Sequence, residues 1–337
     1  MVTVMRRRLL FLAQLAVVGA ILTAVAAAQS TVKALQSKAQ AGDVLSQFDL
    51  GVAYDRGDGV PQNHTKAVFW FQKAAERGLA PAQLNLGIAY DLGRGVQQDY
   101  FKAAMWYRKA AEQGLAGAES NLGSLYVNGQ GVTRDDGQAV VWYRKAADQG
   151  YANAQFLLGE YYLGDGRLPP DWTQAAFWYR KAADQGLADA EFHLGNLYEI
   201  GQGMPQDYTL AATWYRKAAE QGYADAQSRL GILYSTGKGV LQDDVQAANW
   251  TRKAAEQGDA GAQYYLGLIC FLGQGVPQDF AESYFWLDLA ASGKLDAPVL
   301  EKATKSRDQA ASHLTPADLS QAQARASKWF AEHTVSK

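Results

Sequence analysis

The sequence predicts an all-α fold: a solenoid of seven 36-residue helix-hairpin repeats with a helical cap at each end. The stretch WYRKAAEQG or WYRKAADQG occurs four times, and its copies begin 36 residues apart, at Trp106, Trp142, Trp178 and Trp214. Tryptophan continues at this interval on both sides, at Trp70, Trp250 and Trp286. Glycine keeps the same interval at Gly51, Gly87, Gly123, Gly159, Gly195, Gly231 and Gly267. Such a period indicates an array in which each unit buries its apolar face against its neighbours. It favours one elongated array over the two globular domains that the chain length suggests.

The repeated stretch is typical of an amphipathic helix, the second helix of each hairpin. Its apolar residues follow the spacing i, i+3, i+4, i+7 and i+8, as in Ala103, Trp106, Tyr107, Ala110 and Ala111. Gly114 ends this helix, because glycine adopts the left-handed conformation at little cost. A capping residue precedes each copy, at Asn63, Asp99, Asp135, Asp171, Asp207, Asp243 and Asp279.

The segment 188–199, ADAEFHLGNLYE, typifies the first helix of each hairpin. The glycine inside it costs about 1 kcal/mol relative to alanine, so its recurrence predicts that the partner helix approaches too closely for a side chain. The G-x-G that follows, as in Gly201 and Gly203, is interpreted as the turn between the helices. A phosphate-binding loop is the alternative, but no strand precedes it and no lysine follows.

These residues carry a family resemblance. The pattern A-x-A-x-x-x-L-G-x-x-Y-x-x-G-x-G-V-x-x-D, followed by A-x-x-W-Y-x-K-A-A-x-Q-G, resembles the Sel1-like repeat, a relative of the tetratricopeptide repeat, over about three quarters of the chain. The resemblance implies an α/α superhelical solenoid that works as a protein-binding scaffold. The fourth copy departs from it. In LGDGRLPPDW the glycines Gly164 and Gly166 come one place early, so this turn should have its own shape.

The ends of the chain are expected to cover the array. Residues 29–43 match only the second half of a repeat and should cap the first of the seven repeats, which we assign to 44–295. The C-terminal cap, 296–337, should hold two helices, one near 298–313 and one that begins at Thr315 and Pro316. Such caps keep the terminal apolar faces from water.

The first residues predict export. Arg6, Arg7 and Arg8 precede an apolar run from Leu9 to Val25, followed by small residues, which is the layout of a signal peptide over 1–28. An uncleaved membrane anchor is the alternative. Either arrangement places the repeats outside the cytoplasmic membrane, so we expect a periplasmic or secreted protein.

Composition and motifs argue against several functions. Without the three signal arginines the formal charge goes from −2 to −5 (−2 − 3), and no basic block could hold phosphates, so nucleic acid is not an expected partner. The lone Cys270 replaces a repeat tyrosine and is expected to be buried. The four histidines show no metal-ligand spacing and no nucleophile motif occurs. We therefore expect no enzymatic activity, no metal and no cofactor.

A binding surface is predicted from the first-helix positions that vary between copies. Positions 2, 5, 6, 9 and 12 vary and share one stripe, which lines the concave groove in tetratricopeptide-like arrays. Repeats four and five combine large and polar side chains there, next to the irregular turn. The predicted partner-binding residues are Phe156, Glu160, Trp172, Phe192, His193, Asn196 and Glu199.

We therefore expect a monomeric, exported, non-enzymatic scaffold that binds a protein or peptide of the cell envelope. Regulation is its candidate role, and a membrane protein is among the candidate partners. A protein that binds or modifies cell-wall peptidoglycan is the alternative. The sequence does not identify the partner.

Overall fold

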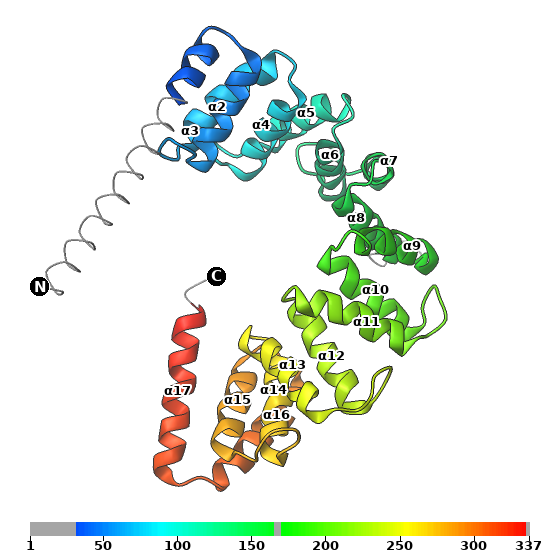
Figure 1. Cartoon of the computed structure of the whole chain (residues 1–337), viewed down its shortest axis with the longest axis vertical. Helices are drawn as coiled ribbons and strands as arrows, with labels where there is room; N and C mark the ends of the chain where they lie inside the picture. The colour runs from blue at the N-terminus through cyan, green and yellow to red at the C-terminus, as the bar shows by residue number, and fades with distance from the viewer. Residues whose placement is uncertain (1–31, 165–169, 335–337) are drawn as a thin grey trace, which may run out of the picture. The chain divides into compact units, whose positions relative to one another are not determined.

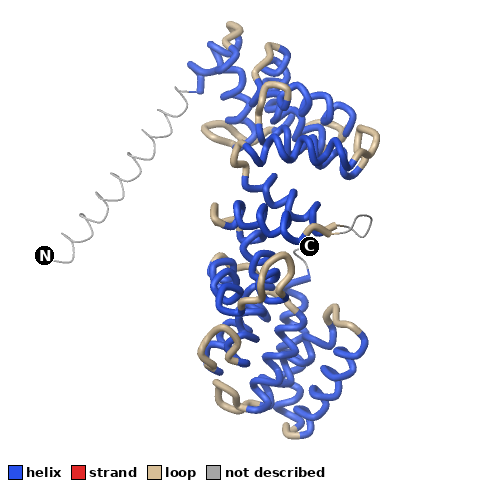
Figure 2. The backbone as a smooth tube through the Cα atoms, turned by 90° about the vertical axis from the view of Figure 1, so that its right-hand side faces the viewer, coloured by secondary structure: helices blue, strands red, loops and turns tan. Residues whose placement is uncertain are grey.

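The computed structural model describes residues 32–164 and 170–334, and all regular structure in these ranges is helical. The signal-peptide segment, and 165–169 of the irregular fourth turn, lie outside the described residues. The chain divides inside one helix, between Ala154 and Gln155, into two compact units. Figures 1 and 2 show that helices joined by short turns build both units.

The first unit contains three complete hairpins. Residues 32–40 are helical and precede them. The hairpin helices are α2 (Val44–Arg56), α3 (His64–Glu76), α4 (Ala80–Leu92), α5 (Tyr100–Ala111), α6 (Ala116–Asn128) and α7 (Asp136–Asp148). Each even-numbered helix packs against the next helix of its own repeat, and α3 and α5 also pack against the first helix of the following repeat (Figure 1).

The second unit begins within α8 (Ala152–Leu163). It continues with α9 (Trp172–Ala183), α10 (Ala188–Ile200), α11 (Tyr208–Glu220), α12 (Ala224–Thr236), α13 (Asp244–Glu256), α14 (Ala260–Leu272) and α15 (Phe280–Ser292). The fourth first helix, α8, ends one residue earlier than its counterparts, and Gly164 takes the left-handed conformation (φ 78°) directly after it.

Two further helices close the C-terminal end, as expected from the sequence. They are α16 (Ala297–Ser312) and α17 (Pro316–Thr334), and both pack against α15. The Thr315 hydroxyl accepts a hydrogen bond from the Asp318 N–H at 3.2 Å, which caps α17. The Arg325 guanidinium lies 3.8 Å from the Phe285 ring centroid and also bonds to Glu282. Thus α17 is attached to the repeats by a cation that contacts both a ring and a carboxylate.

The predicted capping residues start every second helix. In each repeat the side chain of the Asn or Asp accepts a hydrogen bond from the backbone N–H three residues later; for Asp99 and Lys102 the distance is 3.0 Å. Each such cap contributes about 1 kcal/mol. The start of each second helix is therefore fixed locally, by the side chain of the residue that precedes it.

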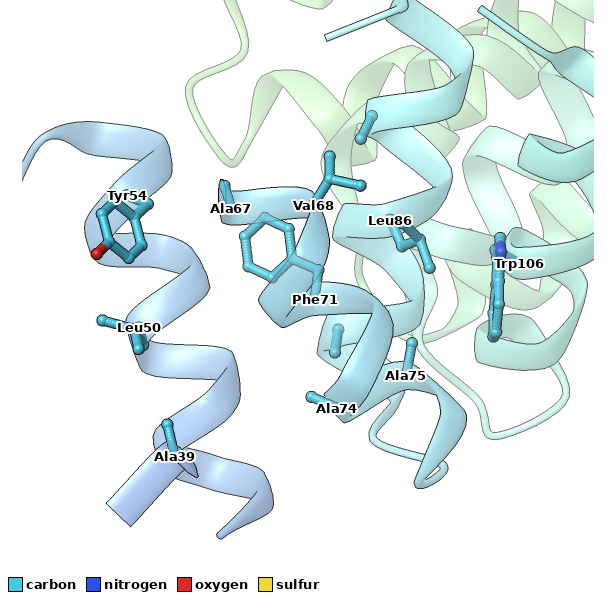
Figure 3. Packing of buried hydrophobic residues seen from close by; sticks show 12 residues of the cluster. Ala39, Leu50, Tyr54, Ala67, Val68, Phe71, Ala74, Ala75, Leu86 and Trp106 are labelled. Atoms are coloured by element: carbon cyan, nitrogen blue, oxygen red, sulfur yellow. The ribbon is translucent and has the colours of Figure 1, made fainter. Parts of the chain in front are cut away.

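In five of the seven repeats the recurrent helical glycine faces a ring, and in the last two Gly231 faces Thr251 and Gly267 faces Leu287. These contacts explain the close approach that the recurrence predicts. A Cβ on Gly87 would lie 2.5 Å from Cδ1 of Tyr107, and one on Gly51 would lie 2.5 Å from Cδ1 of Phe71. Figure 3 shows the Phe71 ring pointing toward α2 between buried side chains of repeats one and two. In the five repeats with a ring, the glycine is needed because an aromatic side chain of the second helix occupies the space of its Cβ.

The G-x-G segments form turns, and their second glycine contacts the preceding repeat. Gly95 has φ 75°, and a Cβ there would lie 2.4 Å from the backbone carbonyl carbon of His64. Likewise, a Cβ on Gly239 would lie 2.2 Å from the backbone carbonyl carbon of Tyr208. Backbone conformation and space thus both require glycine there, and the turns that contain Gly95, Gly131, Gly203, Gly239 and Gly275 pack on the start of the previous second helix.

A buried polar ladder, which the sequence analysis did not foresee, links the repeats. The Gln83 side chain donates to the Ala75 carbonyl of the preceding repeat at 3.2 Å and accepts from Gln113 at 2.8 Å. Glutamate takes this position at Glu119 and Glu191, each only 3% exposed. Burial raises the pKa of both carboxyl groups, while a nearby lysine and a glutamine donor oppose the shift.

The repeat tryptophans pack between repeats. Trp106, Trp178, Trp214 and Trp286 are buried, whereas Trp70, Trp142 and Trp250 are half-buried. A lysine one turn away covers several of them; the Lys145 ammonium lies 4.0 Å from the Trp142 ring centroid. These indoles are thus either buried in the core or covered by a lysine side chain of their own helix.

Candidate binding surface on the first helices

The first-helix face is the surface formed by positions 2, 5, 6, 9 and 12 of the first helices. Six of the seven predicted partner-binding residues belong to it: Phe156 and Glu160 on α8, and Phe192, His193, Asn196 and Glu199 on α10. Glu160 is exposed and the other five are half-buried. All six lie in the second unit, in adjacent repeats.

His193 lies at the centre of a cluster of rings. Its imidazole stacks on Tyr179 with the ring centroids 5.3 Å apart and the planes 25° apart. The Phe156 ring lies 5.6 Å from it and the Phe192 ring 5.3 Å. The fold therefore brings together three predicted residues from two neighbouring first helices, supported from below by the repeat tyrosine of α9.

Phe192 extends this cluster toward repeat six. Its ring centroid lies 5.7 Å from Tyr215 and 5.1 Å from Tyr223, the residue directly before α12. We call the four rings that contact one another in this order, Phe156, His193, Phe192 and Tyr223, the aromatic row. It crosses the first helices of repeats four and five and ends at the start of repeat six.

The two predicted glutamates flank the row, and each accepts a hydrogen bond from the tyrosine hydroxyl of its own repeat. Tyr179 donates to Glu160, whose Oε1 also lies 3.7 Å from His193 Nδ1, and Tyr215 donates to Glu199 Oε2 at 2.6 Å. Burial, together with the bonded carboxylate, raises the pKa of Tyr179 and of Tyr215. These tyrosines therefore stay protonated as donors, and the carboxylates carry the negative charge of the surface.

Trp172 and Asn196 take different positions. Trp172, the first residue of α9, packs against the buried cluster shared by repeats four and five, and its backbone carbonyl meets Gly203. It belongs to the packing between repeats. Asn196 lies one turn after Phe192 on α10 and is half-buried.

Sequence reasoning missed Tyr223, Tyr179 and Tyr215. The last two recur between copies and were assigned to packing alone, although their hydroxyls orient the surface carboxylates. Tyr223 occupies the last position of a repeat, where other copies have Leu79, Asp259 or Lys294. That variation between repeats could have indicated a binding residue, but Tyr223 lies one residue before the helix whose positions were compared.

The first unit has a different feature on its first-helix face. A cavity of about 160 Å³ lies between repeats one and two, lined by Asp55, Ala67, Val68, Phe71, Asn85, Ile88, Ala89 and Arg94. In repeat two the Tyr107 hydroxyl donates to Asp91 at 2.9 Å. Repeat one has Phe71 in place of that tyrosine, and Asp55 pairs instead with His64 at 2.8 Å. The cavity is therefore lined by a phenylalanine that lacks the hydroxyl which Tyr107 has at the same position of repeat two.

Within residues 32–164 and 170–334, no group of three or more His, Cys, Asp or Glu residues could hold a metal ion. In the same ranges no helix is both long enough and apolar enough to span a membrane. Cys270 is 1% exposed, as expected, and burial raises the pKa of its thiol to about 11, so it is a poor nucleophile in the native state.

Comparison with known proteins identifies the repeat. The model of the Sel1 repeat matches seven consecutive segments: 44–79, 80–115, 116–151, 152–187, 188–223, 224–259 and 260–294. A Sel1 repeat protein from Oxalobacter formigenes is 36% identical, with 81% of this chain and 79% of that chain covered and a TM-score of 0.65. A protective antigen of uropathogenic Escherichia coli strains with the same fold is 29% identical, with coverage of 89% and 86% and a TM-score of 0.51. No curated protein matches the chain. The chain thus belongs to the Sel1 repeat family, whose all-α solenoids are a scaffold type for protein–protein interaction.

Proposed function

We propose that this protein is a non-enzymatic scaffold that binds a partner protein of the cell envelope through the first-helix face of repeats four to six. The observation that carries the proposal is the aromatic row flanked by Glu160 and Glu199. Half-buried rings beside oriented carboxylates are typical of binding hot spots, where a few residues supply most of the affinity. They also match the groove chemistry that accepts an extended peptide or a helix.

The division of labour within each repeat supports this role. Alanine, leucine and tyrosine side chains that recur between copies form much of the buried core. The residues of the aromatic row vary between copies and retain exposed surface. Variable exposed side chains on a recurrent scaffold are expected where a partner is recognised.

In this proposal the protein works outside the cytoplasmic membrane, in the periplasm or after secretion. The basic residues Arg6, Arg7 and Arg8 followed by an apolar run support export. Mass spectrometry of the mature protein would test it. A chain that begins at or near Gln29 agrees with cleavage, whereas an intact N-terminus in the membrane fraction indicates an anchor.

Capture from envelope extract tests the binding role. The full mature chain is immobilised beside the variant Phe192→Ala/Glu199→Ala and a matched control, Phe177→Ala/Glu220→Ala. The control removes one exposed phenylalanine and one exposed glutamate from the second helices α9 and α11. We expect one protein to be retained by wild type and control but lost by the first variant, with all three chains equally folded by circular dichroism.

Purified peptidoglycan, tested in parallel, addresses the alternative. Sedimentation of the wild-type chain with peptidoglycan, without any retained protein, would replace the proposal by cell-wall binding. Retention of the same protein by the Phe192→Ala/Glu199→Ala variant would move the site away from the aromatic row.

A further inference from the structure

The first-helix face and the second helices differ in charge. Over the seven repeats, the variable positions of the first helices hold seven carboxylates: Asp49, Asp55, Asp91, Glu160, Asp189, Glu199 and Asp225. They hold one basic residue, Arg229. The second helices α3 to α15 hold 13 lysines and arginines against eight carboxylates. In each unit, acidic residues thus outnumber basic ones at these positions, and four of the seven carboxylates lie in the second unit, which carries the aromatic row.

Within the second unit, carboxylates lie near the end of the row at Tyr223. Asp189 is in the first turn of α10, one turn before Phe192, and Asp225 is in the first turn of α12, two residues after Tyr223. Burial raises the pKa of the Tyr223 hydroxyl, and the charges of Asp189 and Asp225, a hydrogen bond to Asp189 and the charge of Glu160 raise it further. Asp225 and Glu160 are exposed and Asp189 is half-buried, so solvent or a ligand can reach all three. The one basic residue of this face, Arg229, acts on Tyr215, which packs beneath Phe192, and on Asp259. The part of the row around Phe192 and Tyr223 is therefore bordered mainly by negative charge.

Aromatic rings bordered by carboxylates favour cations. A guanidinium or ammonium group gains from the face of a ring and from charge-assisted hydrogen bonds to a carboxylate. The protein already uses this combination to attach α17, since Arg325 contacts the Phe285 ring and bonds to Glu282. That internal contact shows how an arginine on one segment can join it to a repeat.

We infer that the aromatic row of repeats four to six binds a basic segment of the partner protein, with a lysine or arginine placed over Phe192 and Tyr223 and paired with Asp189 and Asp225. This inference rests on the proposed function and specifies the chemistry of the partner. Charge complementarity decides for a basic segment over an acidic one, which Glu160, Asp189 and Asp225 would repel.

A random dodecapeptide library selected on the full mature chain tests it. We expect the selected peptides to be rich in lysine and arginine. Their affinity should fall steeply as salt rises from about 0.05 to about 0.5 M, because exposed charges are screened over that range. Asp189→Asn/Asp225→Asn should weaken binding by about tenfold or more, equivalent to about 1.4 kcal/mol. The control Glu220→Gln/Glu256→Gln, which removes two exposed charges from α11 and α13, should not.

The outcomes separate the two proposals. Acidic or neutral peptides that require Phe192 would overturn the basic partner and leave the binding face in place. Basic peptides that bind the Asp189→Asn/Asp225→Asn variant as well as wild type would also overturn it. Peptides that bind Phe192→Ala/Glu199→Ala undiminished, or no selection at all, would count against the binding face itself. Melting curves of each variant exclude loss of binding through unfolding.

Discussion

The ring of Tyr215 lies against the backbone of Gly195, so that a Cβ on this glycine would come within 2.8 Å of the tyrosine Cδ1. The tyrosine cannot easily retreat, because its side chain is fully buried and its hydroxyl is bonded to Glu199. The same relation recurs between Gly87 and Tyr107. A helix-weakening residue is thus retained at each of these positions to admit a ring.

Gly195→Ala should therefore destabilise the protein, by about 1–3 kcal/mol from overpacking, partly offset by the better helix propensity of alanine. The matched control is Gly117→Ala on α6, where a new Cβ would have its nearest neighbour at 3.4 Å, an ordinary contact. This control should stabilise by up to about 1 kcal/mol. Urea denaturation of both variants measures the contrast, and equal effects of the same sign would contradict it.

A hydroxyl exchange tests the tyrosine–carboxylate bonds. Phe71→Tyr should place a donor beside Asp55, in the cavity of repeat one, and stabilise by about 1 kcal/mol. Tyr107→Phe should remove the donor to Asp91 and cost about 1–2 kcal/mol. Thermal melts of the two single variants provide the test. A destabilising Phe71→Tyr would show that the cavity cannot accept the hydroxyl.

The repeat tryptophans should matter for stability in proportion to their burial. Trp178→Ala, at a site 4% exposed, should cost about 3–5 kcal/mol. Trp142→Ala should cost less, because Trp142 is half-buried and partly covered by Lys145. A circular dichroism melt of Trp142→Ala identical to wild type would mean that this indole makes no net contribution to the packing between repeats.

Glu191 should make stability depend on pH. Burial raises the pKa of its carboxyl group in the folded state above the ordinary 4.5, so the ionised form is disfavoured on folding. Its penalty is absent well below pH 4.5 and grows as pH rises from there through the folded pKa. Glu191→Gln should therefore be more stable than wild type at neutral pH and equal to it in acid. At position 191 the counterpart of the bond that Gln227 donates to Ala219 at 3.0 Å runs to the Ala183 carbonyl. The glutamine amide can donate it at any pH, whereas Glu191 can donate it only when protonated, which adds to the difference at neutral pH and not in acid. Urea midpoints on both sides of pH 4.5 decide the matter, and a difference that does not change with pH would refute the assignment.

Cys270 should resist a thiol reagent in the native protein and react after denaturation. The thiol is 1% exposed, and burial raises its pKa to about 11, so both access and thiolate content are low. Labelling followed by mass spectrometry, with and without urea, measures this. Native labelling at the denatured rate would place the thiol at the surface.

Features that depend on neighbours in sequence could be predicted, and those that depend on distant partners were only partly foreseen. Asp99 caps α5 through a residue three positions away, and Pro316 starts α17, so both were readable from the chain. The recurrence of Gly195 predicted a close approach, but Tyr215, twenty residues on, could not be named as its cause. The Gln221–Glu191 bond joins residues 30 apart and leaves no local pattern.

The candidate site shows the same limit. Comparison of equivalent first-helix positions between repeats predicted that Phe156, Phe192 and His193 lie on one face, and their ring contacts agree with that placement. Trp172 was predicted from its place beside the irregular fourth turn, and it packs in a contact between repeats. The comparison left out Tyr223, because helix periodicity carries no information on a residue that lies beyond the helix start.

The contact of each turn glycine with the preceding backbone has a consequence for how such a chain can change over generations. Where Gly239 meets Tyr208, neighbouring units recognise each other partly through main-chain atoms, which are the same whatever side chain is attached. Whole repeats can then be gained or lost by recombination between copies, since the junctions at Gly95, Gly131, Gly203, Gly239 and Gly275 offer the same backbone surface. Drift at the variable positions meanwhile leaves assembly intact, so a new specificity can arise without a new fold.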